Sequence, residues 1–321
     1  MKNKEKVIIF SHGSDIDGVN CVVLANTAFD SVTHVLAPNP NSLEEKFRSY
    51  LESGKLNNYD YIFVTDLALF NPSLDMVANS PLKDKTFVFD HHKSSLEDGS
   101  NKYPFTTVIV EEDGVKTCGT KLFYNFLVKN NFLKKSDILD EFVELTRLED
   151  VWEWKKVNNP KAHDLAILFN EITVPKYIEW MNKKVETEDH FNFNEIENFV
   201  IENKKEKYIQ NVEKLWNSKE IFEDEYGNKI AVILSPYEYR NELGEYGRTH
   251  DNEEIMYVVV IAFDTAENGQ KSYRSVDTTV DVGKIAEAHN GRGHFAAAGV
   301  NITNEQKRKV MDYILNSKYD E

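Results

Sequence analysis

"VIIFSHGSDIDGVNCVVLANTAF", residues 7–29, decides the fold, because a short apolar run leads through a polar turn into a helical pattern. The apolar run predicts a buried strand, and residues 18–29 predict a helix. Over about the first 130 residues the alternation continues, with strands predicted at 33–37, 61–65 and 86–89 and a helix at 42–53. Continuous aromatic and β-branched runs are typical of strands buried on both faces of a parallel sheet. This part therefore predicts a doubly wound α/β domain.

The rest of the chain predicts a helical region and a second, smaller α/β domain. Residues 160–217 are charged and helical in pattern, with few strand signals. A strand-rich part follows, in which residues 236–254 predict a glycine-bearing loop. Its other predicted elements are strands at 229–235, 255–264 and 270–277, helices at 282–289 and from Asn304, and a glycine-rich stretch at 290–302. The predicted parts are a parallel-sheet domain at 1–190, a helical connector at 191–227 and the smaller α/β domain at 228–321.

Composition narrows the classes of function. Lys and Arg number 38 against 54 Asp and Glu, which gives a net charge of −16. This charge opposes a broad grip on long duplex DNA, so a phosphate substrate must be neutralised locally. Cys21 and Cys118 form no CxxC pair and predict buried free thiols in a reducing cytoplasm. No stretch is long enough for a membrane span, and the number of subunits, monomer or homodimer, stays open.

Metal-type side chains follow several of the predicted strands and one helix. They are His12, Asp15, Asp17, Asp66, Asp90, His91, His92 and Asp150. Ligands in open α/β sheets collect outside the carboxyl ends of the strands, so these groups should converge on one crevice. Taken singly, each has a plain alternative role, since Asp15 or Asp17 could cap the helix that starts near Gly18.

Carboxylates crowded this closely repel one another, so a stable cluster needs divalent cations. Oxygen ligands with a minority of imidazoles and no thiolate favour Mn²⁺, with Mg²⁺ or Co²⁺ as substitutes and Zn²⁺ less suitable. Asp66 and Asp150 offer carboxylates that can bridge two ions at about 3.5 to 4 Å, a separation that can hold an activated hydroxide. Hydrolysis at phosphorus suits this arrangement best.

The order of these residues resembles the DHH phosphoesterase superfamily, which includes RecJ-like and nanoRNase-like oligonucleotide phosphodiesterases. The triplet Asp90-His91-His92 carries the central part of the likeness. The C-terminal "YRSVDTTVDVGKIAEAHNGRGHFAAAGV", residues 273–300, is similar to the DHHA1 domain, with its Arg-Ser step and GGGH-like loop. Motifs of two domains thus occur in the expected order and together cover most of the chain.

The resemblance implies roles for the residues of the first domain. His12, Asp15 and Asp66 would hold one metal ion. A second ion would be held by Asp17, Asp66, His91 and Asp150. Asp90 would orient the ring of His91, and His92 would face the scissile phosphate as a hydrogen-bond donor or acid. In this sequence "HGSD" is shorter than the corresponding segment of many relatives, which makes His12 the least secure ligand.

The resemblance also implies a nucleotide site in the second domain. Arg274, with Ser272 or Ser275 nearby, would clamp a phosphate. The pocket would be shaped by Gly291, Gly293 and His294. Glycines allow close backbone approach and an anion-binding nest of N–H groups, and the alternative is an ordinary turn before a small-residue packing run. Arg292 replaces the middle glycine of the family loop, and both a phosphate contact and a solvent-facing side chain stay open.

The function implied is a two-metal, Mn²⁺-dependent phosphodiesterase of the cytoplasm. Its substrates would be short single-stranded oligonucleotides or dinucleotides, cyclic ones included, and its products nucleoside monophosphates. An inorganic pyrophosphatase of the same superfamily is the alternative enzyme, and "GRGHFAAAGV" argues against it. A non-catalytic nucleotide sensor is the alternative from another class, and in a sensor we would expect eroded metal ligands.

Overall fold

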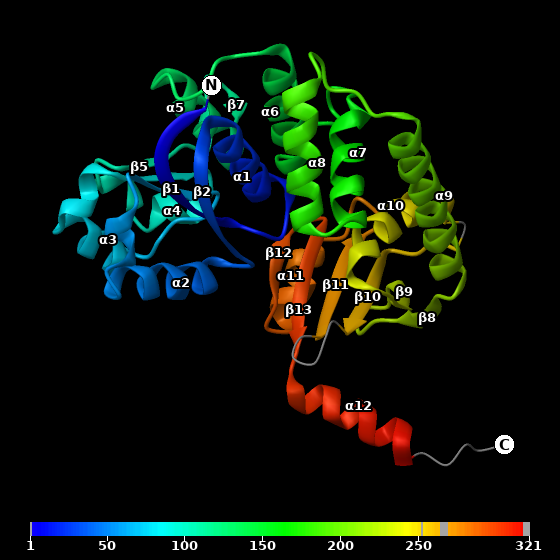
Figure 1. The fold of residues 1–321 in the computed structure, drawn as a ribbon. Helices are drawn as coiled ribbons and strands as arrows, with labels where there is room; N and C mark the ends of the chain where they lie inside the picture. The colour runs from blue at the N-terminus through cyan, green and yellow to red at the C-terminus, as the bar shows by residue number, and fades with distance from the viewer. Residues whose placement is uncertain (1, 252, 264–268, 317–321) are drawn as a thin grey trace. The chain divides into compact units, whose positions relative to one another are not determined.

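The computed structural model describes residues 2–251, 253–263 and 269–316. The chain divides into two compact units, Met1–Ile201 and Glu202–Glu321, each with its own sheet (Figure 1). The division falls within the long helix α9 (Glu195–Asn217), inside the segment predicted as a connector. Asp264, the last residue of a predicted strand, and residues 317–321 lie outside the described residues.

The first unit is built on a five-stranded parallel sheet, as predicted. The strand order is β2-β1-β3-β4-β5, and all four neighbouring pairs run parallel. The strands are β1 (Asn3–His12), β2 (Phe29–Ala37), β3 (Tyr61–Thr65), β4 (Thr86–Asp90) and β5 (Thr106–Val108). A small hairpin of β6 (Glu111–Glu112) and β7 (Val115–Lys116) follows. Because β1 lies between β2 and β3, the connections leave it in opposite directions and open a crevice at the carboxyl ends of β1 and β3.

Helices cover both faces of this sheet, which confirms the doubly wound prediction. Alternate residues of β1 point to different cores, with Ile9 packing on one side and Ile8 on the other. One face carries α1 (Ile16–Ala28), α5 (Gly119–Lys129), α6 (Asp137–Asp150), α7 (Pro160–Glu171) and α8 (Val174–Thr187). The other carries α2 (Pro40–Glu52) and α3 (Asn71–Ala78). Burial on both faces explains why the strands read as continuous apolar runs.

Buried hydroxyl groups hold the carboxyl ends of β1 and β3 together beneath the crevice. Thr65 Oγ1 donates to Ser11 Oγ at 2.7 Å, and Ser11 Oγ donates to the Gly18 carbonyl at 2.7 Å. Both hydroxyls are fully buried. The first turn of α1 is thereby tied to two strand ends, which gives the residues that follow them a rigid base.

The second unit contains a six-stranded mixed sheet of order β12-β13-β11-β10-β9-β8. Only β9 and β10 pair parallel among its described strands. The strands are β8 (Glu220–Glu223), β9 (Lys229–Leu234), β10 (Tyr257–Phe263), β11 (Gly269–Ser275), β12 (Arg292–His294) and β13 (Ala297–Ile302). The helices after α9 are α10 (Arg240–His250), α11 (Val282–Ala288) and α12 (Asn304–Asn316). Residues of α10 and α11 belong to separate hydrophobic cores, so the predicted second α/β domain is confirmed.

One element differs from the sequence prediction. Residues 236–254 were expected to form a glycine-bearing loop, and that expectation is wrong, because α10 occupies most of the segment. Its glycines serve close packing: a Cβ on Gly244 would lie 2.6 Å from Cβ of Arg274, and one on Gly247 would lie 2.6 Å from the Trp216 ring. Tertiary contact thus overrides the low helix propensity of glycine.

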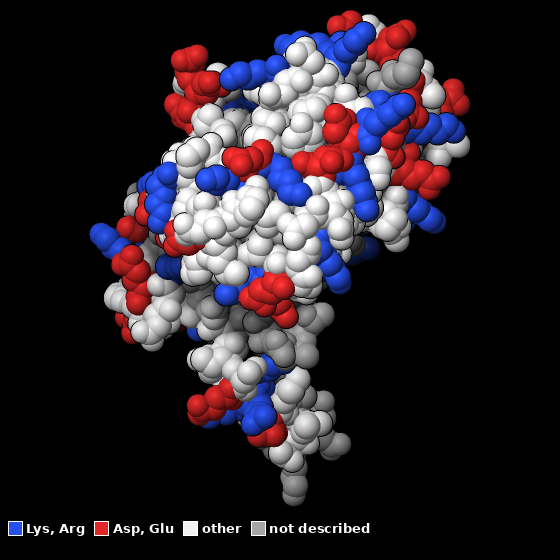
Figure 2. All heavy atoms as spheres, turned by 60° about the vertical axis from the view of Figure 1, so that its left-hand side comes forward, with Lys and Arg blue, Asp and Glu red and all other residues white. Residues whose placement is uncertain are grey.

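The described surface matches the charge balance of the sequence. On the face shown in Figure 2, lysines and arginines are interspersed with aspartates and glutamates, and the described residues there form no continuous basic stripe. Among the described helices, none combines the length and the apolar character that a membrane crossing requires.

Candidate functional site

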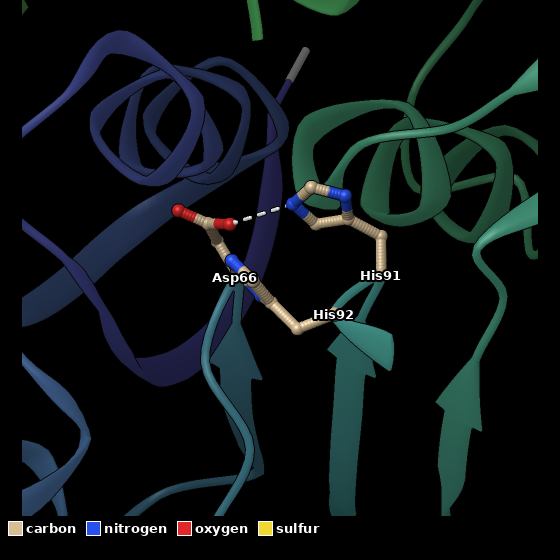
Figure 3. Close-up of side chains that lie close together, drawn as sticks. All are labelled: Asp66, His91 and His92. Carbon is tan, nitrogen blue, oxygen red and sulfur yellow. Dashed lines mark ion pairs between the residues drawn. The ribbon is translucent and has the colours of Figure 1, made fainter. Parts of the chain in front are cut away.

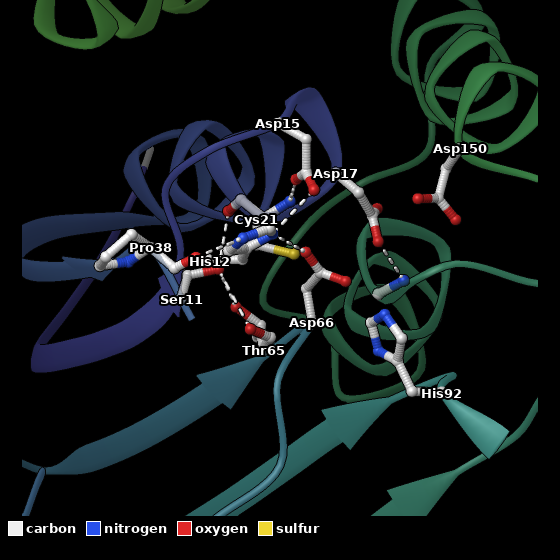
Figure 4. Close-up of polar contacts among 12 residues, drawn as sticks. Ser11, His12, Asp15, Asp17, Cys21, Pro38, Thr65, Asp66, His92 and Asp150 are labelled. Carbon is white, nitrogen blue, oxygen red and sulfur yellow. Dashed lines mark hydrogen bonds and ion pairs between the residues drawn. The ribbon is translucent and has the colours of Figure 1, made fainter. Parts of the chain in front are cut away.

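The predicted metal ligands of the first unit lie together at the carboxyl edge of the sheet (Figure 4). His12 ends β1, Asp66 directly follows β3, His91 directly follows β4 and Asp150 is the last residue of α6. Seven side chains fall into three overlapping groups whose potential ligand atoms lie within 4.8 Å of one another. The groups are His12, Asp15 and Asp66; Asp17, His91 and Asp150; and Asp66, His91 and His92. Two of the three share Asp66, the residue expected to bridge.

The imidazole of His91 faces three carboxylates without bonding to any of them. Its Nε2 lies 3.3 Å from Asp66 Oδ1 (Figure 3), 3.5 Å from Asp150 Oδ2 and 3.7 Å from Asp17 Oδ2. This buried nitrogen and Asp150 Oδ2 have no hydrogen-bond partner among the described residues. Buried polar atoms without partners are rare and costly. A cation at this point would satisfy the nitrogen and the carboxylates together.

His12 has the hydrogen bonding of a metal-binding histidine. Its Nε2 lies 3.2 Å from the Pro38 carbonyl oxygen, which can only accept, so Nε2 carries a hydrogen. In the neutral ring Nδ1 then holds the lone pair, 2.7 Å from Asp15 Oδ2 and 3.4 Å from Asp66 Oδ2. Burial lowers the pKa of His12, but the bonds and charges of Asp15 and Asp66 outweigh burial and raise this pKa to about 10. Without a cation, His12 itself is the positive charge of this group.

Asp15 and Asp17 accept hydrogen bonds from backbone N–H groups at helix N-termini. Asp15 caps α1 by accepting from the Gly18 backbone N–H at 3.2 Å. Asp17 is 1% exposed, and its Oδ2 and Oδ1 accept from the backbone N–H groups of Gly119 and Thr120 at 2.6 and 2.8 Å. These two residues open α5, so the dipole of a second helix also favours the Asp17 carboxylate. A carboxylate has about four acceptor positions, which leaves Asp17 capacity for a cation.

The sequence reasoning missed Gly119 and Thr120. Besides donating to Asp17, Gly119 lets α5 approach the cluster, since a Cβ there would lie 2.7 Å from Cβ of Asp66. Thr120 Oγ1 also donates to the Asp17 backbone carbonyl at 2.6 Å. The signal available in the sequence was weak: a Gly-Thr pair at the start of a helical pattern.

Asp66 and Asp150 occupy unfavourable positions for a carboxylate. Asp66 is buried and adopts a left-handed backbone conformation, with φ of 60°. Non-glycine residues in this region store strain and cluster at functional sites. Asp150 ends α6, where the helix dipole disfavours negative charge. Two carboxyl groups in such positions need a positive charge beside them when they ionise.

The pKa values follow from these environments. Burial raises the pKa of Asp150 to about 9, with the charges of Asp17 and Asp66 adding to the effect. Burial likewise raises the pKa of Asp66 well above its usual range, and the charge of Asp17 again contributes. Neither carboxyl can ionise freely without a counter-charge. The donor set of carboxylates and imidazoles, with its unpartnered buried atoms, therefore fits divalent cations.

Asp90 has a different partner from the one predicted. We expected it to orient the ring of His91, but its Oδ1 lies 2.7 Å from Nδ1 of His92. The same oxygen accepts the backbone N–H of His91 at 2.8 Å, and Ser95 Oγ donates to Oδ2. Burial raises the pKa of Asp90, but the bonds from His92 and Ser95 outweigh it and lower this pKa overall. Asp90 is thus an ionised carboxylate that fixes the ring of His92.

In the second unit, strand register relates the predicted nucleotide-binding residues. Arg274 on β11 and His294 on β12 are both paired with Ala297 on the intervening β13. Directly paired residues share a sheet face, so Arg274 and His294 face the same side two strands apart, about 10 Å. The guanidinium of Arg274 is anchored by Asn241 Oδ1, which accepts from Nε at 2.9 Å. Arg292 precedes His294 by two residues and shares this face.

Ser275 is not placed as predicted. Successive strand residues face opposite sides of a sheet, so Ser275 lies on the other face from Arg274. Its side chain is buried, and its hydroxyl donates to the Asp277 carbonyl. Ser272, the alternative weighed with it, is two residues away and shares the Arg274 face.

The glycine-rich stretch forms β12 and its approach. A Cβ on Gly291 would lie 2.4 Å from the Gly299 carbonyl, and one on Gly293 would lie 2.3 Å from Cα of Ala298. The backbone N–H of Gly291 donates to the Ala286 carbonyl at 2.7 Å. Close packing accounts for both glycines, in agreement with the alternative of an ordinary turn before a small-residue packing run. The nucleotide pocket they were expected to shape stays a prediction.

Comparison with known proteins agrees with the residue pattern. No protein-family model matches the chain. The chain is 29% identical to the oligoribonuclease NrnB of Bacillus subtilis over 301 residues, which are 92% of this chain and 73% of that protein. The DHH domain of a protein described as a member of a ribosomal-protein family superposes with a TM-score of 0.57 at 13% identity, covering 98% of this chain and 87% of that chain. The pGpG-specific phosphodiesterase PggH of Vibrio cholerae gives 0.49 at 12% identity, over 97% of this chain and 98% of that one.

The fold and the clustered Asp and His side chains define a phosphoesterase of the α/β class with a parallel catalytic sheet. The chain is related to the oligoribonuclease NrnB along almost its whole length, and its clustered residues follow the pattern of DHH-family phosphoesterases. It is therefore a hydrolase of phosphate esters.

Proposed function

We propose that the protein is a Mn²⁺-dependent phosphodiesterase that hydrolyses short oligonucleotides or dinucleotides to nucleoside monophosphates. The observation that carries this proposal is the convergence of three carboxylates on Nε2 of His91, at 3.3 to 3.7 Å. Similarity to an oligoribonuclease over 92% of the chain supports the choice of nucleotide substrates. The two buried free thiols are typical of a reducing compartment, and we place the enzyme in the cytoplasm.

Two divalent ions would be held at the carboxyl edge of the first sheet. His12, Asp15 and Asp66 would bind one. The other would be bound by Asp17, Asp66, His91 and Asp150. When bound, the ions would supply Lewis acidity and lower the pKa of water, which is the chemistry that hydrolysis at phosphorus needs. The protein's own contribution is to hold anions that cannot relax away from the ions, since α1 and α5 fix Asp15 and Asp17.

His92 is the residue placed to handle the leaving oxygen. Its Nδ1 is bonded to Asp90, so Nε2 is the nitrogen that can contact substrate. The hydrogen bond that His92 donates to Asp90, ahead of the opposing effect of burial, raises the pKa of His92. The ring is therefore biased toward the protonated form, which can donate to the oxygen that departs from phosphorus. Asp90 acts here as a positioning residue.

The second unit would bind the nucleotide. Arg274, held by Asn241, and His294 share a sheet face, and both can donate to a phosphate. Burial lowers the pKa of Arg274 to about 10, with the nearby charge of Arg240 adding to the effect. A guanidinium that is partly desolvated and beside another cation favours binding of an anion.

The test is product analysis on a substrate panel. Purified protein is incubated with Mn²⁺, Mg²⁺, Co²⁺ or EDTA and with RNA and DNA of two to five nucleotides, cyclic dinucleotides, 3′-phosphoadenosine 5′-phosphate or pyrophosphate. Chromatography should show Mn²⁺-stimulated release of nucleoside monophosphates. Absence of metal-stimulated cleavage of every nucleotide would refute the proposal, and faster turnover of pyrophosphate would replace it with a pyrophosphatase. Asp66→Asn is the inactive control.

A further inference from the structure

A cavity of about 520 Å³ adjoins the metal cluster on the α2 and α3 side of the first sheet. His12 and His92 belong both to the cluster and to the lining of this cavity. The rest of the wall comes from the turn before α2, the segment between Asp66 and α3, and the start of α4 (Lys93–Glu97). Ligand pockets typically measure about 300 to 1,000 Å³, so the space is large enough for one nucleoside.

Away from His12 and His92, the charges of the lining disfavour a second phosphate. Among the described residues that line the cavity, none is Lys or Arg. Its two carboxylates belong to Asp90, already bonded to His92 and Ser95, and to Asp98. Away from His12 and His92, an anionic group would meet the Asp98 carboxylate and no Lys or Arg among the described lining residues, which is costly. The part of the cavity away from the two histidines therefore favours an uncharged group.

An exposed aromatic ring lines the cavity. Phe70, at the start of α3, is 42% exposed, while Leu67 and Leu69 before it are buried. The backbone N–H of Phe70 donates to Glu44 Oε2 at 3.1 Å, and Ser73 Oγ donates to the other oxygen of the same buried carboxylate. The ring is thus carried on a fixed backbone. Exposed aromatic side chains on rigid supports are stacking platforms for nucleobases.

A buried acceptor completes the lining. Asn71 Nδ2 donates to the Asp98 carbonyl at 2.9 Å, which settles the orientation of the amide. Its Oδ1 is buried without a hydrogen-bond partner among the described residues. A base edge or a ribose hydroxyl carries the donor that this oxygen lacks, whereas a phosphate dianion carries none.

We propose that this cavity is the subsite for the nucleoside attached to one side of the scissile phosphate, with Phe70 stacking on its base and Asn71 accepting from it. The proposal rests on the proposed function and adds to it that recognition on this side is of a nucleoside rather than of a pyrophosphate or polyphosphate group. Phe70 is a specificity-determining residue for the substrate class.

The test uses dinucleotides in which either the 5′ or the 3′ base is replaced by hydrogen. Loss of a stacked base weakens binding by about 5- to 100-fold. We expect one abasic analogue to lose kcat/KM by about this factor with the wild-type enzyme, and Phe70→Ala to cause the same loss on the intact dinucleotide but little on that analogue. Phe70→Trp should retain wild-type kcat/KM. Met76→Ala, which changes a 38% exposed side chain of the same helix outside the cavity, should leave kcat/KM unchanged.

A binding measurement separates this proposal from the proposed function. The intact dinucleotide is titrated into metal-free protein in EDTA, and Phe70→Ala should weaken its Kd while Met76→Ala does not. If no nucleotide is hydrolysed but this difference in Kd is found, the function is wrong and the subsite stands. If dinucleotides are hydrolysed but Phe70→Ala matches the wild type on every analogue, the subsite is refuted alone. Competition by pyrophosphate in EDTA at the same concentration would also overturn it.

Discussion

Replacing Asp150 by Asn should stabilise the metal-free protein at neutral pH. Burial, with the charges of Asp17 and Asp66, raises the pKa of Asp150 from 3.8 to about 9. At pH 7 the folded protein therefore binds a proton that the unfolded chain releases, so the carboxyl destabilises the fold relative to a neutral amide. Between the unperturbed pKa of 3.8 and pH 7 lie about three pH units, each worth about 1.4 kcal/mol. Asp150→Asn can therefore raise the free energy of unfolding by at most about 4 kcal/mol at pH 7.

The pH dependence has a definite sign. Because the pKa of Asp150 is higher in the folded protein, stability from its protonation is fully present below about pH 4 and is lost as the pH rises toward 9. The advantage of Asp150→Asn in EDTA should thus grow from about 2 kcal/mol or less at pH 5 to about 4 kcal/mol at pH 7. Urea unfolding followed by circular dichroism measures this difference. Asp30→Asn, at an exposed carboxylate, should change stability by less than about 0.5 kcal/mol.

Manganese should narrow the stability advantage of Asp150→Asn. At a concentration of about 100 times Kd, Mn²⁺ should stabilise the wild type by about 2.7 kcal/mol per site, and Asp150→Asn should gain less because it has lost a ligand. A variant that is less stable than the wild type in EDTA at pH 7, or whose advantage is independent of pH, would refute the reasoning. In that case other groups of the protein would already neutralise the Asp150 charge in the metal-free state.

Three further substitutions test other parts of the structure. Asp66→Asn should abolish Mn²⁺-stimulated hydrolysis and Mn²⁺ binding by calorimetry without changing the circular dichroism spectrum; retained binding of two ions would contradict the bridging role. His92→Gln should lower kcat about 100- to 10,000-fold on dinucleotides. The loss should be far smaller on p-nitrophenyl esters of nucleotides, whose leaving group needs no proton. Equal losses on both substrates would argue against His92 as a general acid. Gly244→Ala would set a methyl group 2.6 Å from Cβ of Arg274 and should cost about 1 to 3 kcal/mol of stability; an unchanged Tm would refute the packing explanation.

The parallel sheet could be predicted because its signal is local. Strands buried on both faces need continuous apolar runs, and residues 61–65 and 86–89 supply them within five residues or fewer. The start of β1 could not be predicted, since Asn3–Lys6 is polar and is held in the strand by pairing with β2. Helix α10 was missed because Gly244 and Gly247 favour a loop. The reason for these glycines is their close packing against Arg274 and Trp216, which the sequence does not reveal.

The candidate site was predictable where side chains carry the chemistry and not where the backbone does. Asp and His residues that follow predicted strands can be identified in the sequence, and the parallel topology brings them to one edge of the sheet. The support of Asp17 comes from two backbone N–H groups more than 100 residues away, at Gly119 and Thr120. Every residue carries such a group, so composition gives no sign of it. The pairing of Asp90 with His92 rather than His91 depends on side-chain rotamers, which adjacency in sequence does not determine.

The cluster is asymmetric, and this asymmetry explains how it can be both stable and reactive. Asp15 and Asp17 accept hydrogen bonds from backbone N–H groups at the N-termini of α1 and α5. Asp66 and Asp150 are placed where charge is disfavoured, by burial and by a helix C-terminus. If divalent ions bind as proposed, the first pair would attract the cation and the second pair would lose protons on binding. Asp66 and Asp150 thus make the metal-free fold less stable, a cost that the proposed binding of divalent ions would offset.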